Sequence, residues 1–276
     1  MRAFKFSLSL LSVFFFACIS DSPKSIEVEI EKKDSSTNFE NIEKINSIKH
    51  IFFSLPSPIE LTYLFKQEGV EYQRDKLFST KEKDNYILPR EKALILGIYG
   101  ADLSYAGLFG KHQDAIEYFA TVQMIAEDIG VGQTFQKEFI LRLERNANSK
   151  DTLLQVISEF FIENDNYLKD HERQEISALI LLGGWVEGIY LGTEMALDYN
   201  AVGIKKILAE QKSSLENMIL LLDQIKVSSV SENLLDSLKG LLPHFNQLNE
   251  DSLLDDADFL VIKDKISAIR ASIIKR

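Results

Sequence analysis

The chain has 276 residues, and 31 Lys and Arg against 42 Asp and Glu give it a net charge of −11. A hydrophobic share of 45% is too high for a disordered protein, and the acidity argues against a nucleic-acid partner, which needs clustered Lys and Arg. One cysteine excludes an intramolecular disulfide, and with only four His it excludes a Cys-based zinc site. Because only 5 Pro and 13 Gly interrupt the sequence, most of the chain is free to be helical.

The first element in chain order has the features of an export signal. A short cationic start precedes an uncharged run over Phe6–Ala17, which is too short for a bilayer that needs about 20 residues. The run ends directly before the single cysteine, Cys18. The sequence Phe15-Phe16-Ala17-Cys18 resembles a bacterial lipoprotein signal, in which the cysteine is lipidated and becomes the first mature residue, although Phe15 stands where an aliphatic residue is usual.

This resemblance implies that residues 1–17 are a removed signal peptide and that Cys18 is the lipid attachment site. The alternative is an ordinary secretory signal that contains Cys18 by chance. Loss of Arg2 and Lys5 takes the net charge from −11 to −13, so we expect acyl chains rather than charge to hold the protein at a membrane. Ile19 stands where Asp would retain a lipoprotein in the inner membrane, which favours the outer membrane and leaves its orientation open.

Residues 18–40 are polar, charged and rich in Ser, and we expect them to form a flexible tether. As a coil, such a segment spans about 25 Å, which holds a domain clear of the lipid headgroups. The alternation of Ile26, Val28 and Ile30 leaves a short strand over 26–30 as the alternative.

From residue 41 onward the apolar spacing is helical, and we expect residues 41–276 to form a single all-α domain of about 9–11 helices. Ser57-Pro58-Ile59-Glu60 and Ser79-Thr80-Lys81-Glu82 are capping boxes, and Pro243 is expected to break the helix before it. The predicted helices are 41–53, 58–69, 79–85, 89–110, 111–129, 133–145, 150–163, 167–198, 201–226, 230–242 and 253–274.

The last of these helices begins with an acidic cluster, Asp255, Asp256 and Asp258. A cation site is one interpretation, but carboxylates in a first helical turn also stabilise the helix dipole, and no calcium loop has the required spacing. We therefore interpret the cluster as capping. An apolar stripe is expected to face inward and consists of Phe259, Ile262, Ile266, Ile269 and Ile273.

The sequence also lacks the usual signs of a cofactor or metal site. Gly97-Ile98-Tyr99-Gly100 follows no predicted strand, so it is not a dinucleotide-binding fingerprint. The four His form no pair with the spacing of a di-iron bundle. We expect no cofactor and no metal.

Two segments, 93–110 and 178–195, are apolar on nearly all sides and contain several glycines. Each carries one central carboxylate, Asp102 or Glu187, and the segments align at an offset of 85, which suggests an internal repeat or a chance likeness of two core helices. A membrane span is disfavoured, because a central acid costs about 2.5–3.5 kcal/mol on insertion scales. We expect two buried central helices, with the glycines allowing either close helix packing or space for a ligand.

The two carboxylates raise the question of a functional pocket. Such a polar-aromatic pocket would be lined by Asp102, Glu187, Tyr99, Tyr105, Trp185 and Tyr190. The alternative is structural: each buried acid is held by a tyrosine one turn away, Tyr105 or Tyr190, or by an arginine. The candidate arginines are Arg90, Arg142, Arg145 and Arg173. No catalytic residue is assigned.

The stretch from Leu55 to Met195 resembles a family of uncharacterised helical lipoproteins of Bacteroidota. The resemblance rests on Leu55-Pro56-Ser57-Pro58-Ile59-Glu60, on the segment from Lys92 to Tyr105, and on Gly183-Gly184-Trp185-Val186-Glu187. It implies a lipoprotein with an all-helical fold and brings no known activity.

The sequence therefore favours a lipid-anchored cell-envelope protein that acts as a non-enzymatic binding or envelope-organising module. The alternatives are an envelope enzyme that uses Asp102 and Glu187, or a carrier of a small ligand in the same pocket. A closed contact between the two Gly-rich helices would favour the first, and an open cavity reaching both acids would favour the others. The expected partners are the membrane, through the anchor, and an unknown protein or small ligand.

Overall fold

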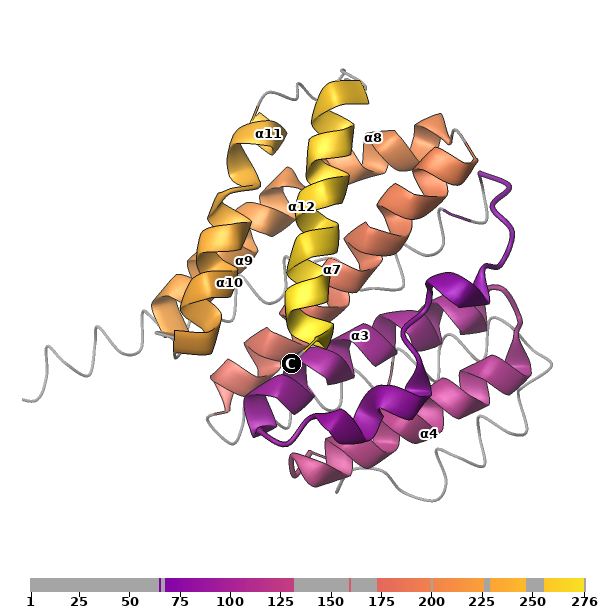
Figure 1. Ribbon diagram of the computed structural model, residues 1–276, viewed down its shortest axis with the longest axis vertical. Coiled ribbons are helices and arrows are strands. Elements are labelled where there is room, and N and C mark those ends of the chain that lie inside the picture. Colours follow the sequence, from indigo (N-terminus) through magenta and orange to yellow (C-terminus); the bar gives the residue numbers. More distant parts are fainter. Residues whose placement is uncertain are drawn as a thin grey trace, which may run out of the picture. The chain divides into compact units, whose positions relative to one another are not determined.

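The computed structural model describes residues 65, 68–131, 159, 173–199, 201–225, 229–246 and 256–275, all within the compact unit Ile42–Arg276 (Figure 1). This part of the chain is helical and contains no strand, which confirms the all-α prediction. The signal, the tether and the predicted helices 41–53 and 133–145 lie outside the described residues, as does all of the predicted helix 150–163 except residue 159.

The described elements follow the predicted order. Two 3-10 helices, η1 and η2, precede α3, and η2 begins at the predicted cap, where the Ser79 hydroxyl accepts from Lys81 N. The elements are η1 (Arg74–Lys76), η2 (Thr80–Asn85), α3 (Pro89–Leu108), α4 (His112–Asp128), α7 (Gln174–Asp198), α8 (Val202–Glu210), α9 (Lys212–Ile225), α10 (Ser229–Lys239), α11 (Leu242–Asn246) and α12 (Asp256–Ile274).

Local chemistry sets both ends of α3 and the end of α4. Pro89 begins α3, where its missing N–H costs no helical hydrogen bond, and the Glu91 carboxylate accepts from Leu88 N. Gly110 and Gly130 have φ of 64° and 72° and end α3 and α4 in the left-handed conformation that glycine adopts without strain. In both caps the next residue donates back across the last turn, Lys111 N to Ala106 O in the first.

Two predicted boundaries are wrong. The predicted helix 201–226 is two helices, because the chain turns at Gln211, whose N–H donates to Leu208 O rather than one residue further back. Pro243 does not end a helix but lies in the first turn of α11, where the orphan N–H groups of a helix tolerate proline.

The largest helix–helix contact in the described part is between α3 and α7, and it is closed by glycine. A Cβ on Gly97 would overlap the Ile180 carbonyl oxygen and lie 2.6 Å from Gly184 N, and a Cβ on Gly183 would overlap the Leu94 carbonyl oxygen. The two backbones therefore touch directly. Gly183 and Gly184 both take part in this contact, whereas Gly192 faces Leu208 of α8.

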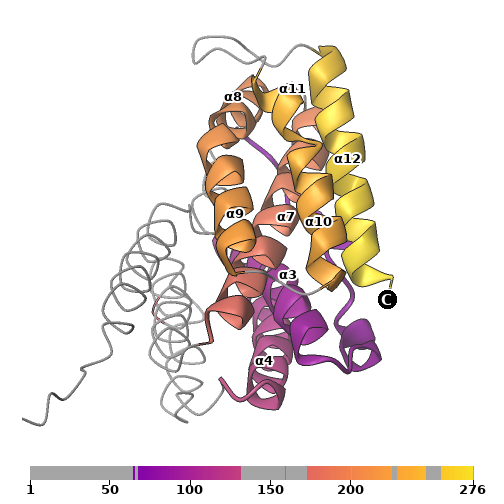
Figure 2. The same ribbon diagram turned by 90° about the vertical axis from the view of Figure 1, so that its left-hand side faces the viewer.

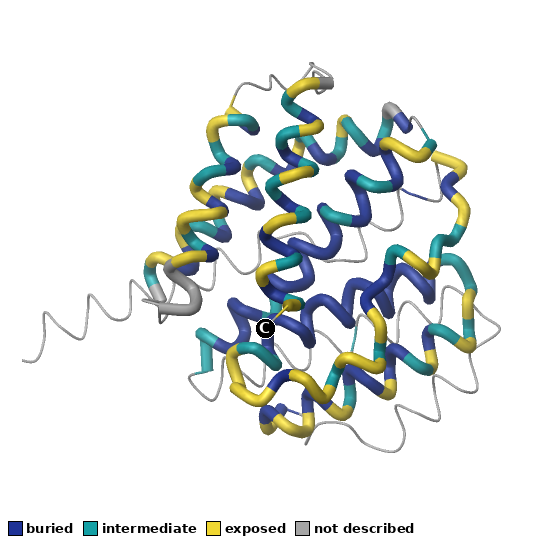
Figure 3. Tube along the Cα trace, in the orientation of Figure 1, coloured by how far each residue is buried: buried dark blue, intermediate teal, exposed yellow. Residues whose placement is uncertain are grey.

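The other helices cover this pair. The views in Figures 1 and 2 agree that α4 packs against α3, while α8, α9 and α12 pack against α7. Every residue of α3 from Ala93 to Leu108 is buried, whereas α4, α10 and α12 alternate between buried and exposed positions (Figure 3). The predicted inward stripe of α12 is confirmed, since Phe259, Ile262, Ile266, Ile269 and Ile273 are all buried.

One helix of the described part, α7, is long and apolar enough to cross a membrane. Most of that apolar stretch is buried against other helices, and the core helix of a soluble protein has the same length and composition. The burial matches the expected role of α7 as a central helix.

The α3–α7 contact generates a stability prediction. Gly97→Ala should lower the free energy of unfolding by about 3 kcal/mol or more, because the new methyl group meets backbone that can move only if a whole helix shifts. Chemical denaturation of the purified protein measures the loss.

Gly203→Ala in α8 is the matched control. The three atoms nearest to its Cβ would belong to the carboxylate end of the exposed Glu68 side chain. This side chain can move aside at the loss of its exposed hydrogen bond from Gly203 N, so the change should stay below about 1 kcal/mol. Equal losses in the two variants would contradict direct backbone packing.

Candidate functional site

The two predicted acids meet in the core. Asp102 on α3 and Glu187 on α7 are fully buried, and their carboxyl groups lie within hydrogen-bond reach of each other. Each acid follows the glycine contact by about one turn, since Gly97 and Gly183 precede them by five and four residues. The offset of 85 therefore pairs Asp102 with Glu187, whereas Gly97 and Gly183 are 86 residues apart.

The partner of these acids is Arg270, which comes from α12. Its Nε donates to Glu187 Oε2 at 2.5 Å and its Nη2 donates to Glu187 Oε1 at 2.8 Å. Nη2 also approaches the Lys76 carbonyl oxygen at 3.5 Å, and the guanidinium lies 4.1 Å from the centre of the Tyr190 ring. Arg270 is only 9% exposed, so this is a buried bidentate ion pair.

Asp102 has weaker support. Its Oδ2 accepts from Phe78 N at 3.0 Å, but no described donor reaches Oδ1. Burial raises the pKa of Asp102 well above its ordinary value, the charge of Glu187 raises it further, and Arg270 offsets this only in part. Burial lowers the pKa of Arg270. The charges of the two acids and the hydrogen bonds to Glu187 outweigh this effect, so the pKa is raised.

Of the four arginines that the sequence offered as partners of the acids, the two described ones bind elsewhere. Arg90 forms a surface ion pair with Glu175, at 2.6 and 3.0 Å, and Arg173 donates to the Gly130 carbonyl oxygen at 3.5 Å. Arg142 and Arg145 lie outside the described residues. A signal for Arg270 did exist, because it lies four residues after Ile266 and three before Ile273, on the inward stripe of α12.

A tyrosine one turn away was one of the two partners that the sequence left open for each acid, and Tyr105 does not hold Asp102. Its hydroxyl donates to Glu71 O at 3.3 Å and accepts from Gln73 N at 3.1 Å. Tyr99 donates to Ser79 O at 2.8 Å. Burial raises the pKa of both hydroxyls, for Tyr105 to about 12. These two side chains hold the segment before α3 in place, while Tyr190 takes part in the cluster through its ring.

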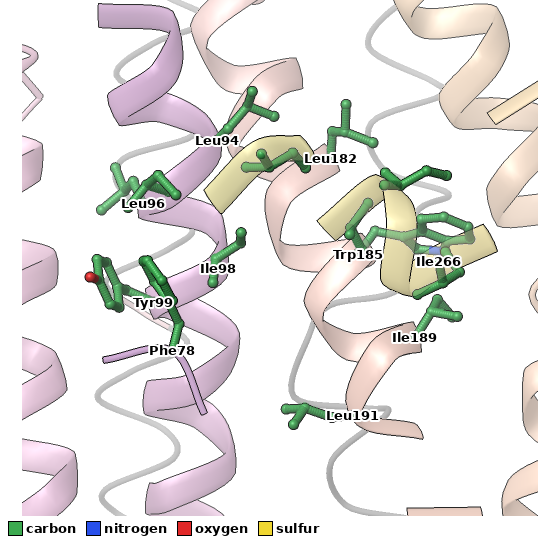
Figure 4. Packing of buried hydrophobic residues seen from close by; sticks show 14 of the residues in the cluster. Phe78, Leu94, Leu96, Ile98, Tyr99, Leu182, Trp185, Ile189, Leu191 and Ile266 are labelled. Atoms are coloured by element: carbon green, nitrogen blue, oxygen red, sulfur yellow. The ribbon is translucent and has the colours of Figure 1, made fainter. Parts of the chain in front are cut away.

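Trp185 is buried at 4% exposure and takes no part in the charged cluster. Figure 4 draws it beside Ile266, where α12 packs on α7, and no described acceptor reaches its Nε1. The six residues of the predicted pocket therefore separate into three groups. Asp102, Glu187 and Tyr190 meet Arg270, Tyr99 and Tyr105 fix the preceding segment, and Trp185 packs apart from both.

A solvent-open cleft of about 720 Å³ lies elsewhere, between the segment 72–81 and α4, and none of the six residues lines it. Its walls carry a polar network in which Arg74 pairs with Asp114 and Glu117, and Thr80 also donates to Glu117. The described residues hold no group of three or more His, Cys, Asp or Glu that could bind a metal ion. Asp258, from the acidic cluster of α12, lies 3.5 Å from His244 Nδ1.

Arg270 should be critical for stability. Arg270→Met should lower the free energy of unfolding by about 3–5 kcal/mol, because it leaves the Glu187 carboxylate buried without a counter-charge. Chemical denaturation at neutral pH measures this loss.

The matched comparison is Arg90→Met, which removes a bidentate pair of the same kind at the surface, where the side chains of Arg90 and Glu175 are 45% and 28% exposed. Its cost should stay below about 1 kcal/mol. A loss for Arg270→Met as small as that for Arg90→Met would contradict the importance of the buried pair.

No protein-family model matches the chain, and no curated protein or solved structure matches it either. The resemblance to helical lipoproteins of Bacteroidota therefore stays a prediction.

Proposed function

We propose that the protein is a lipid-anchored component of the bacterial cell envelope whose helical part is a non-enzymatic binding or organising module. The observation that carries the proposal is the closed α3–α7 contact, in which Asp102 and Glu187 have no exposed surface. The proposed anchor is Cys18, supported by the signal-like sequence before it.

The chemistry of the two acids favours this function over an enzyme. A general acid or base must come within hydrogen-bond reach of the substrate proton that it transfers. Glu187 is instead engaged by Arg270 on both oxygens, and Asp102 is engaged by Phe78 N and by Glu187. Both acids are thus occupied in joining α3, α7 and α12.

A small-ligand carrier remains the second candidate, and the observation in its favour is the open cleft between segment 72–81 and α4. Its volume, about 720 Å³, is within the usual range for small-molecule sites. Its lining includes charges of both signs, from Arg74, Lys81, Asp75 and Glu117, so a carried ligand would be polar. The pocket around Asp102 and Glu187 is the less favoured place, because Arg270 and Tyr190 occupy the space beside the acids.

The anchor has a direct test in a bacterium that makes lipoproteins. Metabolic labelling with a clickable fatty acid should label the protein, and Cys18→Ser should abolish the label and release the protein from the membrane fraction, because no other cysteine can accept acyl chains.

Ser20→Ala, two residues further along, is the control and should keep both the label and the membrane association. A labelled Cys18→Ser protein, or an unlabelled parent chain, would refute lipidation at Cys18.

The non-enzymatic role has a separate test through crosslinking in cells. Asp102→Asn keeps the shape of the side chain and removes its acid function, so the envelope proteins crosslinked to the anchored chain should be unchanged. The same variant should restore any envelope defect of a deletion strain as well as the parent chain does. Restoration by the parent chain alone, with both proteins folded and equally abundant, would favour an enzyme that uses Asp102.

A further inference from the structure

Two carboxyl groups lie near one guanidinium at the junction of α3, α7 and α12, and the guanidinium donates to Glu187. Both acids are fully buried and Arg270 is 9% exposed, so water cannot neutralise an excess charge there. If Asp102 and Glu187 were both ionised, the junction would carry a net charge of −1. Among the described side chains Arg270 is the cation that acts on both acids, since the Lys76 ammonium is paired with Glu194 and Asp198.

The other titratable groups around Asp102 are tyrosines, whose hydroxyl groups are neutral at physiological pH. The groups that face the junction are Tyr99 and Tyr105 from α3, Tyr118 from α4, Glu187 and Tyr190 from α7 and Arg270 from α12, together with Tyr86, the Phe78 amide and the Lys76 carbonyl from the preceding segment.

The hydrogen bonds show which carboxyl oxygen of the junction lacks a donor. Glu187 receives two donors from Arg270, and Asp102 Oδ2 receives the Phe78 amide, but no described donor reaches Asp102 Oδ1. An ionised carboxylate has no hydrogen to give to the neighbouring Glu187. A neutral Asp102 has one, and an O–H at Oδ1 would donate to Glu187 while Oδ2 still accepts from Phe78 N.

We propose that Asp102 is a neutral carboxylic acid in the folded protein, that it donates its proton to Glu187, and that loss of this proton loosens α12 from the α3–α7 pair. The protonated junction is electrically neutral, with Glu187 negative and Arg270 positive. The junction then works as a proton-dependent latch on α12.

The sign of the effect follows from proton binding. The pKa of Asp102 is raised in the folded state, so the folded protein holds this proton more tightly than the unfolded chain. The stabilisation is complete below the ordinary Asp pKa of about 3.9 and is lost as the pH rises from there to the folded value. Over that window the equilibrium constant for opening should grow about tenfold per pH unit relative to a variant without the titrating group.

The geometry indicates that α12 is the element that moves. α3 and α7 are held together by backbone contact at Gly97 and Gly183, which does not depend on charge. α12 is held by its apolar stripe and by Arg270, whose counter-charges are the two acids. An ionised Asp102 repels Glu187 and needs water, although Arg270 attracts it. Because α3 and α7 are held by backbone contact, α12 is the covering helix that can move to admit this water.

The single tryptophan provides the measurement, since Trp185 lies beside Ile266 where α12 packs on α7 (Figure 4). Emission and acrylamide quenching are recorded for the full chain from about pH 5 to about pH 9, below the ordinary tyrosine pKa near 10. The parent chain should shift to longer wavelengths and become more quenchable as the pH rises. Asp102→Asn, whose amide donates to Glu187 at every pH, should show neither change.

Glu175→Gln is the matched control, because it removes a carboxylate of α7 that is paired with Arg90 at the surface. It should keep the pH response of the parent chain. A response in Asp102→Asn equal to that of the parent chain would overturn the proposal.

A second measurement does not depend on how the variants fold. Infrared spectra of the parent chain with ¹³C-labelled aspartate should contain the carbonyl band of a protonated carboxylic acid at neutral pH, where exposed aspartates are ionised. Absence of this band in the folded parent chain would also overturn the proposal.

Discussion

Direct contact between the backbones of α3 and α7 determines where the charged groups of the core lie. Gly97 and Gly183 let the helices approach until carbonyl and amide groups are neighbours, and residues one turn further on must then face each other. Asp102 and Glu187 occupy these positions, so the close approach that benefits apolar packing also brings two acids into one water-free space. The helix contact therefore buries carboxyl groups, and Arg270 of α12 and the amide of Phe78 supply the hydrogen bonds that these groups require.

The hydrogen bonds of Arg270 link parts of the chain that are far apart in sequence. Arg270 lies 83 residues from Glu187 and contacts the carbonyl of Lys76, 194 residues away. Tyr86 makes another long-range hydrogen bond to α12, because its hydroxyl donates to Ile274 O at 2.7 Å. α12 is therefore attached by polar contacts to the segment before α3 as well as to α7. Such long-range ties couple the position of α12 to the state of the core carboxyls.

Much of the fold could be predicted because local chemistry determines it. Pro89, Gly110 and Gly130 mark helix ends through backbone geometry that only these residue types favour, and the spacing of Ile262, Ile266 and Ile273 marks a buried face. The partner of Glu187 was missed because helical spacing says which face of α12 points inward, but not which helix it meets. The roles of Tyr99 and Tyr105 were missed for the same reason, since their acceptors lie in a segment without regular pattern.

The glycine contact also limits how the sequence can change. At most core positions a larger side chain can be accommodated by trimming a neighbouring side chain, so that two substitutions compensate each other. The atoms opposite Gly97 and Gly183 are backbone carbonyl oxygens, which every residue type possesses. No second-site substitution can remove them, so these two positions tolerate a larger residue only if an entire helix moves.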